Sequence, residues 1–343
     1  MAGFISDLKL GAKLGNGAFG DVFQGDDPAH GQVAVKVLKR DAFRHDDNVW
    51  PVFKASYLAE AKNLAKAGHR NVVQVHHVVE APDGDSVVIC MSFCPGGSLE
   101  AAFNRGPMSL SAVRKVGTEV LMGLSVMHAR GMVHRDIKPA NILLTGNAEV
   151  QISDFGLVTD DLVMGYASQA GYLDHVAHEV WNGKGTSAKS DIWALGMTLY
   201  RLLHGKTWYD QLPSPKTIIK DGGFVGTLTW LPHVTKPWRT AIRKMMNDDT
   251  AARCQNAAQA LKVLANLPTT PLWETSVTAD LVRWQQVKGA RRQVVEWQHH
   301  SPRRHEWEAR SEPIGRGQTK RLAGSTGIVS RSVALKGLES FFA

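Results

Sequence analysis

The stretch from residue 134 to residue 156 constrains this chain more than any other part of its sequence. It reads His134-Arg-Asp136-Ile-Lys138-Pro-Ala-Asn141, then an apolar run and a turn, then Asp154-Phe-Gly156. Phosphoryl transfer needs an acid near the attacking hydroxyl group and oxygen ligands for magnesium. Two acids and one amide at this spacing supply that set.

A glycine-rich segment near the N-terminus predicts a second part of a phosphate site. Apolar and polar residues alternate on both sides of Gly15-x-Gly17-x-x-Gly20-x-Val22, which indicates a hairpin with a glycine-rich tip. Glycines let backbone amides approach phosphate oxygens. The alternative is a plain flexible turn. The apolar strand that follows, ending at Lys36, favours nucleotide binding over that alternative and over a dinucleotide fold, where a helix would follow.

Together these motifs resemble those of the eukaryotic-type (Hanks-type) serine/threonine protein kinases. The resemblance covers about residues 8–267 and implies an α+β, two-lobed kinase fold with ATP between the lobes. It implies a small antiparallel-sheet N-lobe over about 8–91, a hinge over 92–97 and a larger, mainly helical C-lobe over 98–267.

The resemblance also implies roles for residues of the catalytic stretch. Asp136 orients the substrate hydroxyl and accepts its proton, and Lys138 lies near the transferring phosphate. Asn141 and Asp154 hold Mg²⁺. A Lys two residues after the catalytic Asp is similar to Ser/Thr-directed rather than Tyr-directed kinases.

Lys36 is implied to bind the α and β phosphates of ATP, held by an acid on the next helix. A helical pattern covers residues 52–67, and Glu60 is its only acid, so Glu60 is the expected partner. A solvated strand-edge lysine and an exposed helix charge are the simpler alternatives for these two residues.

The adenine site is expected at the connection between the lobes. Backbone groups near Phe93 and Cys94 resemble the kinase hinge, with Met91 behind the pocket and Leu143 as its floor. The residues expected to bind ATP are Leu14, Gly15, Gly17, Gly20, Val22, Ala34, Lys36, Met91, Phe93, Cys94 and Leu143.

Residues 154–179 resemble an activation segment with two departures from the family pattern. His178 stands where the family has Pro, and Tyr172 where it has Thr. Candidate phospho-acceptors are Thr159, Ser168 and Tyr172.

Four further residues match structural positions of the family. Glu179 and Arg253 are expected to form a buried ion pair. Asp191 is expected to brace the catalytic loop, and His134 to be structural rather than a general base.

Composition and charge bound the remaining possibilities. The 343 residues carry a net charge of +8, and residues 269–343 hold 12 Lys/Arg against 7 Asp/Glu. No apolar stretch approaches the roughly 18 residues of a membrane span, and no secretory signal is visible. Cys90, Cys94 and Cys254 form no disulfide or metal framework by spacing, which is typical of buried thiols in a cytoplasmic protein.

Residues 268–343 are expected to be a basic, tryptophan-containing extension, partly helical and partly flexible. One or two helices are predicted over 275–300, docked on the large lobe through tryptophans, and a flexible segment over 315–327. Ser325 follows the basic pair Lys320-Arg321, a pattern that resembles a substrate or pseudosubstrate. Single-stranded nucleic acid binding by aromatics and charge is a weaker alternative.

The sequence therefore predicts ATP- and Mg²⁺-dependent phosphorylation of Ser/Thr in proteins, with autophosphorylation and a regulatory tail. Three alternatives stay open: a catalytically silent scaffold, a small-molecule kinase suggested by the activation-segment departures, and a nucleic-acid-binding protein.

Overall fold

The structure, a computed structural model, describes residues 8–17, 20–40, 49–65, 68–81, 84–154, 173–212 and 215–343. Most of the activation segment, with Thr159, Ser168 and Tyr172, lies outside the described residues.

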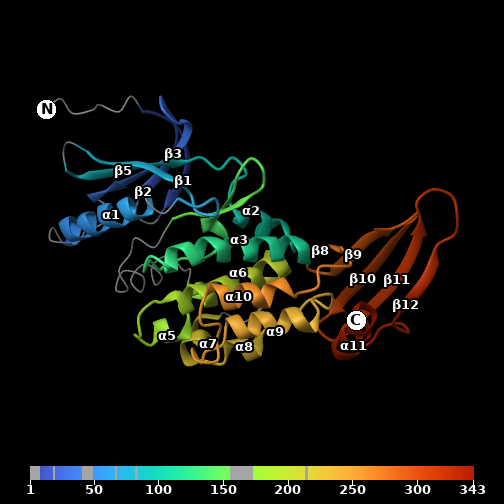
Figure 1. Cartoon of the computed structure of the whole chain (residues 1–343). Coiled ribbons are helices and arrows are strands. Elements are labelled where there is room, and N and C mark those ends of the chain that lie inside the picture. The colour runs from blue at the N-terminus through green and yellow to red at the C-terminus, as the bar shows by residue number, and fades with distance from the viewer. Residues whose placement is uncertain are drawn as a thin grey trace.

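The N-terminal lobe is an antiparallel sheet of order β1-β2-β3-β5-β4, with helix α1 packed on one face (Figure 1). The bounds are β1 Lys9–Gly17, β2 Gly20–Asp27, β3 Gly31–Lys39, β4 Val75–Glu80, β5 Ser86–Ser92 and α1 Val49–Ala65. Alternation along β5 assigns Val87 and Ile89 to the α1 side, while Val88 and Cys90 lie on the opposite face. The predicted glycine-rich hairpin and the strand that carries Lys36 are confirmed.

The larger lobe is helical and centres on α6, whose residues are almost all buried. Its start is set by Ser187, whose hydroxyl accepts from the Lys189 amide while the Ser190 hydroxyl accepts from the Ser187 amide. The helices of the larger lobe are α2 Leu99–Arg105, α3 Leu110–His128, α5 His178–Trp181, α6 Ala188–Tyr209, α7 Pro215–Asp221, α8 Phe224–Thr227, α9 Lys236–Met245 and α10 Ala257–Ala265. The predicted two-lobed α+β fold is confirmed.

Short elements carry the catalytic stretch between the lobes. They are the 3-10 turn Pro139–Asn141 and the paired strands β6 Ile142–Leu144 and β7 Val150–Ile152. A further 3-10 turn, Leu173–His175, lies beyond that stretch, ahead of α5. No helix in the described parts of the chain is long and apolar enough to cross a bilayer.

The predicted helices over residues 275–300 are wrong, because this region forms strands. A second antiparallel sheet has the order β12-β11-β10-β9-β8, followed by helix α11 (Figure 1). The predicted flexible segment is also wrong for residues 320–324, which form a strand. The bounds are β8 Glu274–Val277, β9 Leu281–Lys288, β10 Arg291–Ser301, β11 Arg304–Pro313, β12 Lys320–Gly324 and α11 Arg331–Phe342.

Cross-strand pairs explain why these segments are strands. Trp297 lies between Val282 on β9 and Trp307 on β11, so one face of three strands carries large apolar side chains. Helix α11 closes that face with Ala334 and Leu338, both fully buried. A Cβ on Gly337 would lie 2.9 Å from the Trp307 ring, so glycine allows the close approach.

The predicted docking through tryptophans is confirmed. The Trp284 indole N–H donates to His233 Nδ1 at 2.9 Å, and the Trp208 and Trp297 ring centroids lie 6.3 Å apart. Arg239 on α9 pairs with Glu339 on α11 at 2.6 Å. The second sheet therefore shares its apolar core with the helical lobe.

Buried histidines in this core make folding sensitive to acid. Burial lowers the pKa of His204 and of His233, each to about 3. Because the unfolded state binds protons near pH 6.5 and the folded state does not, this stability is present above that pH and is lost as pH falls toward the folded pKa.

We expect a drop from pH 7 to pH 5 to cost about 2 kcal/mol of unfolding free energy for each of these two histidines. Urea unfolding at both pH values measures the loss, and a His233→Gln variant should show a smaller pH dependence than the wild type. An equal pH dependence in the two proteins would show that His233 does not contribute.

Candidate active site

The catalytic stretch brings Asp136, Lys138 and Asn141 together. The Asn141 amide nitrogen donates to the Asp136 carboxylate at 2.7 Å and to the Asp136 carbonyl at 2.9 Å. Lys138 Nζ lies 2.9 Å from the same carboxylate. The carboxylate is partly exposed, whereas Lys138 and Asn141 are buried, so two buried donors hold one accessible acid.

Asp191 at the start of α6 braces this loop, as predicted. Its carboxylate accepts the backbone amides of His134 and Arg135, both at 2.8 Å, and lies 2.8 Å from His128 Nε2. Arg135 has a φ of 71°, a conformation that needs such support in a residue other than glycine. The contact of His128 with Asp191 was not predicted from the sequence, because it forms only where the end of α3 packs against α6.

His134 is a structural residue, as predicted. It is fully buried, and its ring contacts the Ser153 carbonyl at 3.0 Å, next to Asp154. Burial lowers its pKa despite the nearby Asp191 and Asp136 carboxylates, so the ring is neutral at pH 7.

An ion pair joins the two lobes. Lys36 Nζ on β3 lies 2.5 Å from Asp154 Oδ1, which follows β7. Burial alone would lower the pKa of Lys36, but the Asp154 carboxylate and the Tyr57 phenol together outweigh burial, and the pKa lies above its usual value. Likewise, burial would raise the pKa of Asp154, but its neighbours, Lys36 foremost and then Lys138, together outweigh burial and lower that pKa. Both groups are therefore charged at pH 7.

The helix that carries Glu60 faces Lys36 with another side chain. Tyr57 on α1 is buried, and its phenol also raises the pKa of Lys36. Glu60 lies three residues further along α1, on the same side of the helix, but its side chain lies outside what the structure describes. The Glu60 partnership stays a prediction. Tyr57 was missed, although its i−3 spacing from Glu60 was available in the sequence.

The surroundings of the glycines differ along the hairpin, so glycine serves a different purpose at each position. A Cβ on Gly20 would lie 2.0 Å from the Val37 carbonyl, so the sheet itself requires glycine there. A Cβ on Gly15 would meet nothing within 4 Å, which leaves its backbone open to a ligand. Gly17 pairs with Gly20 across the tip, and Val22 pairs with Lys36.

The predicted adenine residues lie on neighbouring strands and at the connection between the lobes. Met91 pairs with Ala34 across β3 and β5. Phe93 and Cys94 follow β5, and the Cys94 thiol donates to Gln151 at 3.3 Å. Leu143 bridges to Ser98 just beyond the connection.

Leu14, on β1, is 46% exposed, so its side chain is available to a ligand. The structure thus places these residues along the line between the lobes, and their contacts with ATP stay predictions.

Asn141 and Asp154 fit a hard cation. Both contacts of the Asn141 amide with Asp136 use its nitrogen, so among the described residues its oxygen stays available as a ligand. The Asp154 side chain is 38% exposed and ionised, and Lys36 contacts only one of its oxygens. Carboxylate and amide oxygens are the ligands that Mg²⁺ prefers. Asp154 has a φ of 53°, as is common at functional sites.

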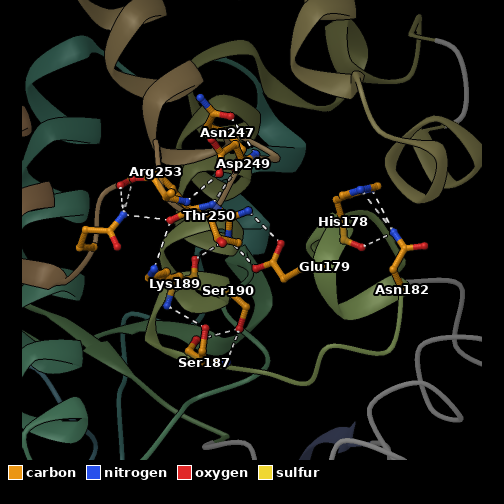
Figure 2. A network of polar contacts seen from close by, with 12 residues as sticks. His178, Glu179, Asn182, Ser187, Lys189, Ser190, Asn247, Asp249, Thr250 and Arg253 are labelled. Carbon is orange, nitrogen blue, oxygen red and sulfur yellow. Dashed lines mark hydrogen bonds and ion pairs between the residues drawn. The ribbon is translucent and has the colours of Figure 1, made fainter.

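Behind the site, the predicted Glu179–Arg253 ion pair is confirmed. Arg253 donates to both Glu179 oxygens, at 2.6 and 2.8 Å, and also to the Lys189 carbonyl (Figure 2). Both residues are buried, so the pair ties α5 to the α9–α10 connection, and the bond to the Lys189 carbonyl extends the tie to α6. His178 stands where the family has proline. Its Nδ1 lies 3.0 Å from the Ile219 carbonyl oxygen.

A sequence model of the protein kinase domain family matches residues 8–264. Cytokinesis protein sepH of Aspergillus terreus is 34% identical over 214 residues, 62% of this chain and 15% of that protein. Probable serine/threonine-protein kinase PknB of Lactococcus lactis is 29% identical, over 60% of this chain and 33% of that protein. Serine/threonine-protein kinase STY46 of Arabidopsis thaliana is 30% identical, over 61% of this chain and 35% of that protein. The chain thus spans about a third or less of the length of these relatives.

Proposed function

This chain belongs to the protein kinase domain family, and we propose that it transfers the γ-phosphoryl group of ATP to Ser and Thr hydroxyls of proteins. One observation carries the proposal: Lys36 from one lobe meets Asp154 from the other at 2.5 Å. Asp136 and Asn141 lie on the adjoining loop. A catalytically silent scaffold has no need to hold all four groups in this arrangement.

Protein kinases use ATP and Mg²⁺, and the metal ion neutralises charge on the transferring phosphoryl group. In this chain Asn141 and Asp154 hold the ion, and Lys36 binds the α and β phosphates. Asp136 accepts a hydrogen bond from the attacking hydroxyl and takes its proton as transfer proceeds. Lys138, already beside Asp136, stabilises charge on the phosphoryl oxygens.

Incubation of the purified full chain with radiolabelled ATP, Mg²⁺ and a generic protein substrate tests this function. We expect label on Ser and Thr residues of the substrate and on the chain itself, located by mass spectrometry. Label that appears only on a small metabolite would favour the small-molecule kinase, and no label on any substrate would favour the scaffold.

Two finer parts of the proposal concern domain boundaries and location. We place a catalytic domain over 8–267 and a C-terminal module over 268–343, where the second sheet begins. The three cysteines of the chain are buried free thiols, which suits a reducing cytoplasm.

Regulation by the C-terminal module is also proposed, through its packing on the large lobe rather than through insertion into the substrate site. Lys320 and Arg321 lie on β12, and the Ser325 amide donates to the Trp307 carbonyl at 2.9 Å. These bonds hold the segment in the sheet. We therefore expect autophosphorylation to spare Ser325 in the folded protein.

The Asp154→Asn variant should weaken Mg²⁺-dependent nucleotide binding by at least about tenfold, because the change removes a charged metal ligand. Titration with a fluorescent nucleotide, with and without Mg²⁺, measures the effect. The loss should be much smaller without Mg²⁺. A loss of equal size in both conditions would mean that Asp154 serves the fold or Lys36 instead.

A further inference from the structure

The outer face of the N-terminal sheet, opposite α1, carries a cluster of three metal-ligating side chains. Asp27, His77 and Cys90 each offer a donor atom, and these atoms lie within 4.8 Å of one another. They come from the end of β2, from β4 and from β5. The cluster lies apart from the phosphoryl-transfer site, because Lys36 lies on the face of the sheet that packs against α1.

The sheet register brings these residues together. His77 is directly opposite Cys90, and a bulge between Val75 and His77 shifts the register of β4. The bulge lets His77 share the Cys90 face, while Val75 and Val78 remain with the α1 core. Asp27 ends β2, where its Oδ1 accepts the amides of Ala29 and His30 at 2.9 and 3.0 Å.

Protein contacts leave part of this cluster unsatisfied. His77 Nε2 is buried and has no hydrogen-bond partner among the described residues. The nearest acid is Asp27, whose Oδ2 lies 3.9 Å away, beyond hydrogen-bond distance. Asp27 itself is 5% exposed, and Cys90 is fully buried against Val33 and Val35. A buried, unpaired imidazole nitrogen beside a buried acid and a thiol needs an explanation.

We propose that Asp27, His77 and Cys90 bind a zinc ion on the outer face of the N-terminal sheet. Zinc takes sulfur, imidazole nitrogen and carboxylate oxygen together, whereas Mg²⁺ and Ca²⁺ take oxygen alone. Zinc bonds of about 2.0–2.3 Å place tetrahedral donors about 3.3–3.8 Å apart, so the present donors need to close by only about 1 Å.

Three protein ligands leave one position of a tetrahedral zinc site for a fourth donor. Water would fill that position. Zinc would thereby join the β2–β3 turn to β4 and β5.

Zinc binding must displace the Cys90 proton. Burial, with a smaller contribution from the Asp27 carboxylate, raises the pKa of Cys90 to about 11.

Isothermal titration of the reduced full chain with ZnCl₂, without nucleotide, tests the proposal. We expect one equivalent to bind, with release of a proton, and Co²⁺ to give a thiolate charge-transfer band. His77→Gln and Cys90→Ser should each lose this binding, and Cys254→Ser, a buried cysteine in the other lobe, should keep it.

His77→Gln guards against a folding artefact, because its side chain is partly exposed and the variant's metal-free melting temperature should match the wild type. Two results would overturn the proposal: the absence of a one-to-one event in the wild type, or equal zinc affinity in His77→Gln and the wild type. The latter would assign the zinc to other histidines of the chain.

Discussion

Replacing Asp136 by Asn should reduce phosphoryl transfer by about 10²–10⁴-fold and leave nucleotide affinity nearly unchanged. The amide keeps the size of the side chain but cannot accept the proton of the attacking hydroxyl. The Asp136 carboxylate contacts Asn141 and Lys138, whereas Lys36, the lysine proposed to bind the α and β phosphates, contacts Asp154. This difference separates the role of Asp136 from nucleotide binding. Single-turnover assays and nucleotide titration measure the two quantities.

A matched control is Asp210→Asn. Asp210 follows α6, and its side chain is exposed and paired only with Lys206 among the described residues. We expect this variant to keep wild-type turnover. Wild-type turnover in Asp136→Asn itself would remove the proposed role from this residue.

Loss of the C-terminal module should destabilise the large lobe. Removal of residues 268–343 takes Trp284 and Phe342 away from His233 and uncovers the lobe's apolar surface. We expect the truncated chain to aggregate or to melt at a much lower temperature. The pseudosubstrate hypothesis for Ser325 predicts the opposite result, a truncated chain with raised activity on an added peptide.

A single substitution measures the same interface more gently. Trp284 is fully buried, so Trp284→Ala should cost about 3–5 kcal/mol of unfolding free energy and leave His233 Nδ1 without its donor. Val287, on the same strand, is 64% exposed, and Val287→Ala should stay within about 0.5 kcal/mol. Urea unfolding compares the two. A truncated chain with unchanged melting temperature and activity would make the module a passive appendage.

The sequence by itself determined the fold of the N-terminal and the larger helical lobe and most of the candidate site. The catalytic stretch, the glycine-rich hairpin and the strand of Lys36 are local patterns, because each role depends on residues that stand close together in the chain. Asp191, Glu179 and Arg253 were also predicted, since their spacing follows the family pattern. The structure places Asp191 at the start of α6, where it accepts the Arg135 amide of the catalytic loop, and pairs Glu179 with Arg253.

The tertiary structure alone decided the C-terminal module and the outer-face cluster. Strands such as β10 are stabilised by neighbours across the sheet, as where Trp297 meets Trp307, and a window along the chain does not contain those neighbours. For the same reason the cysteine spacing showed no metal framework. Asp27, His77 and Cys90 are distant in sequence, and only strand pairing and one bulge place their donors on a common face.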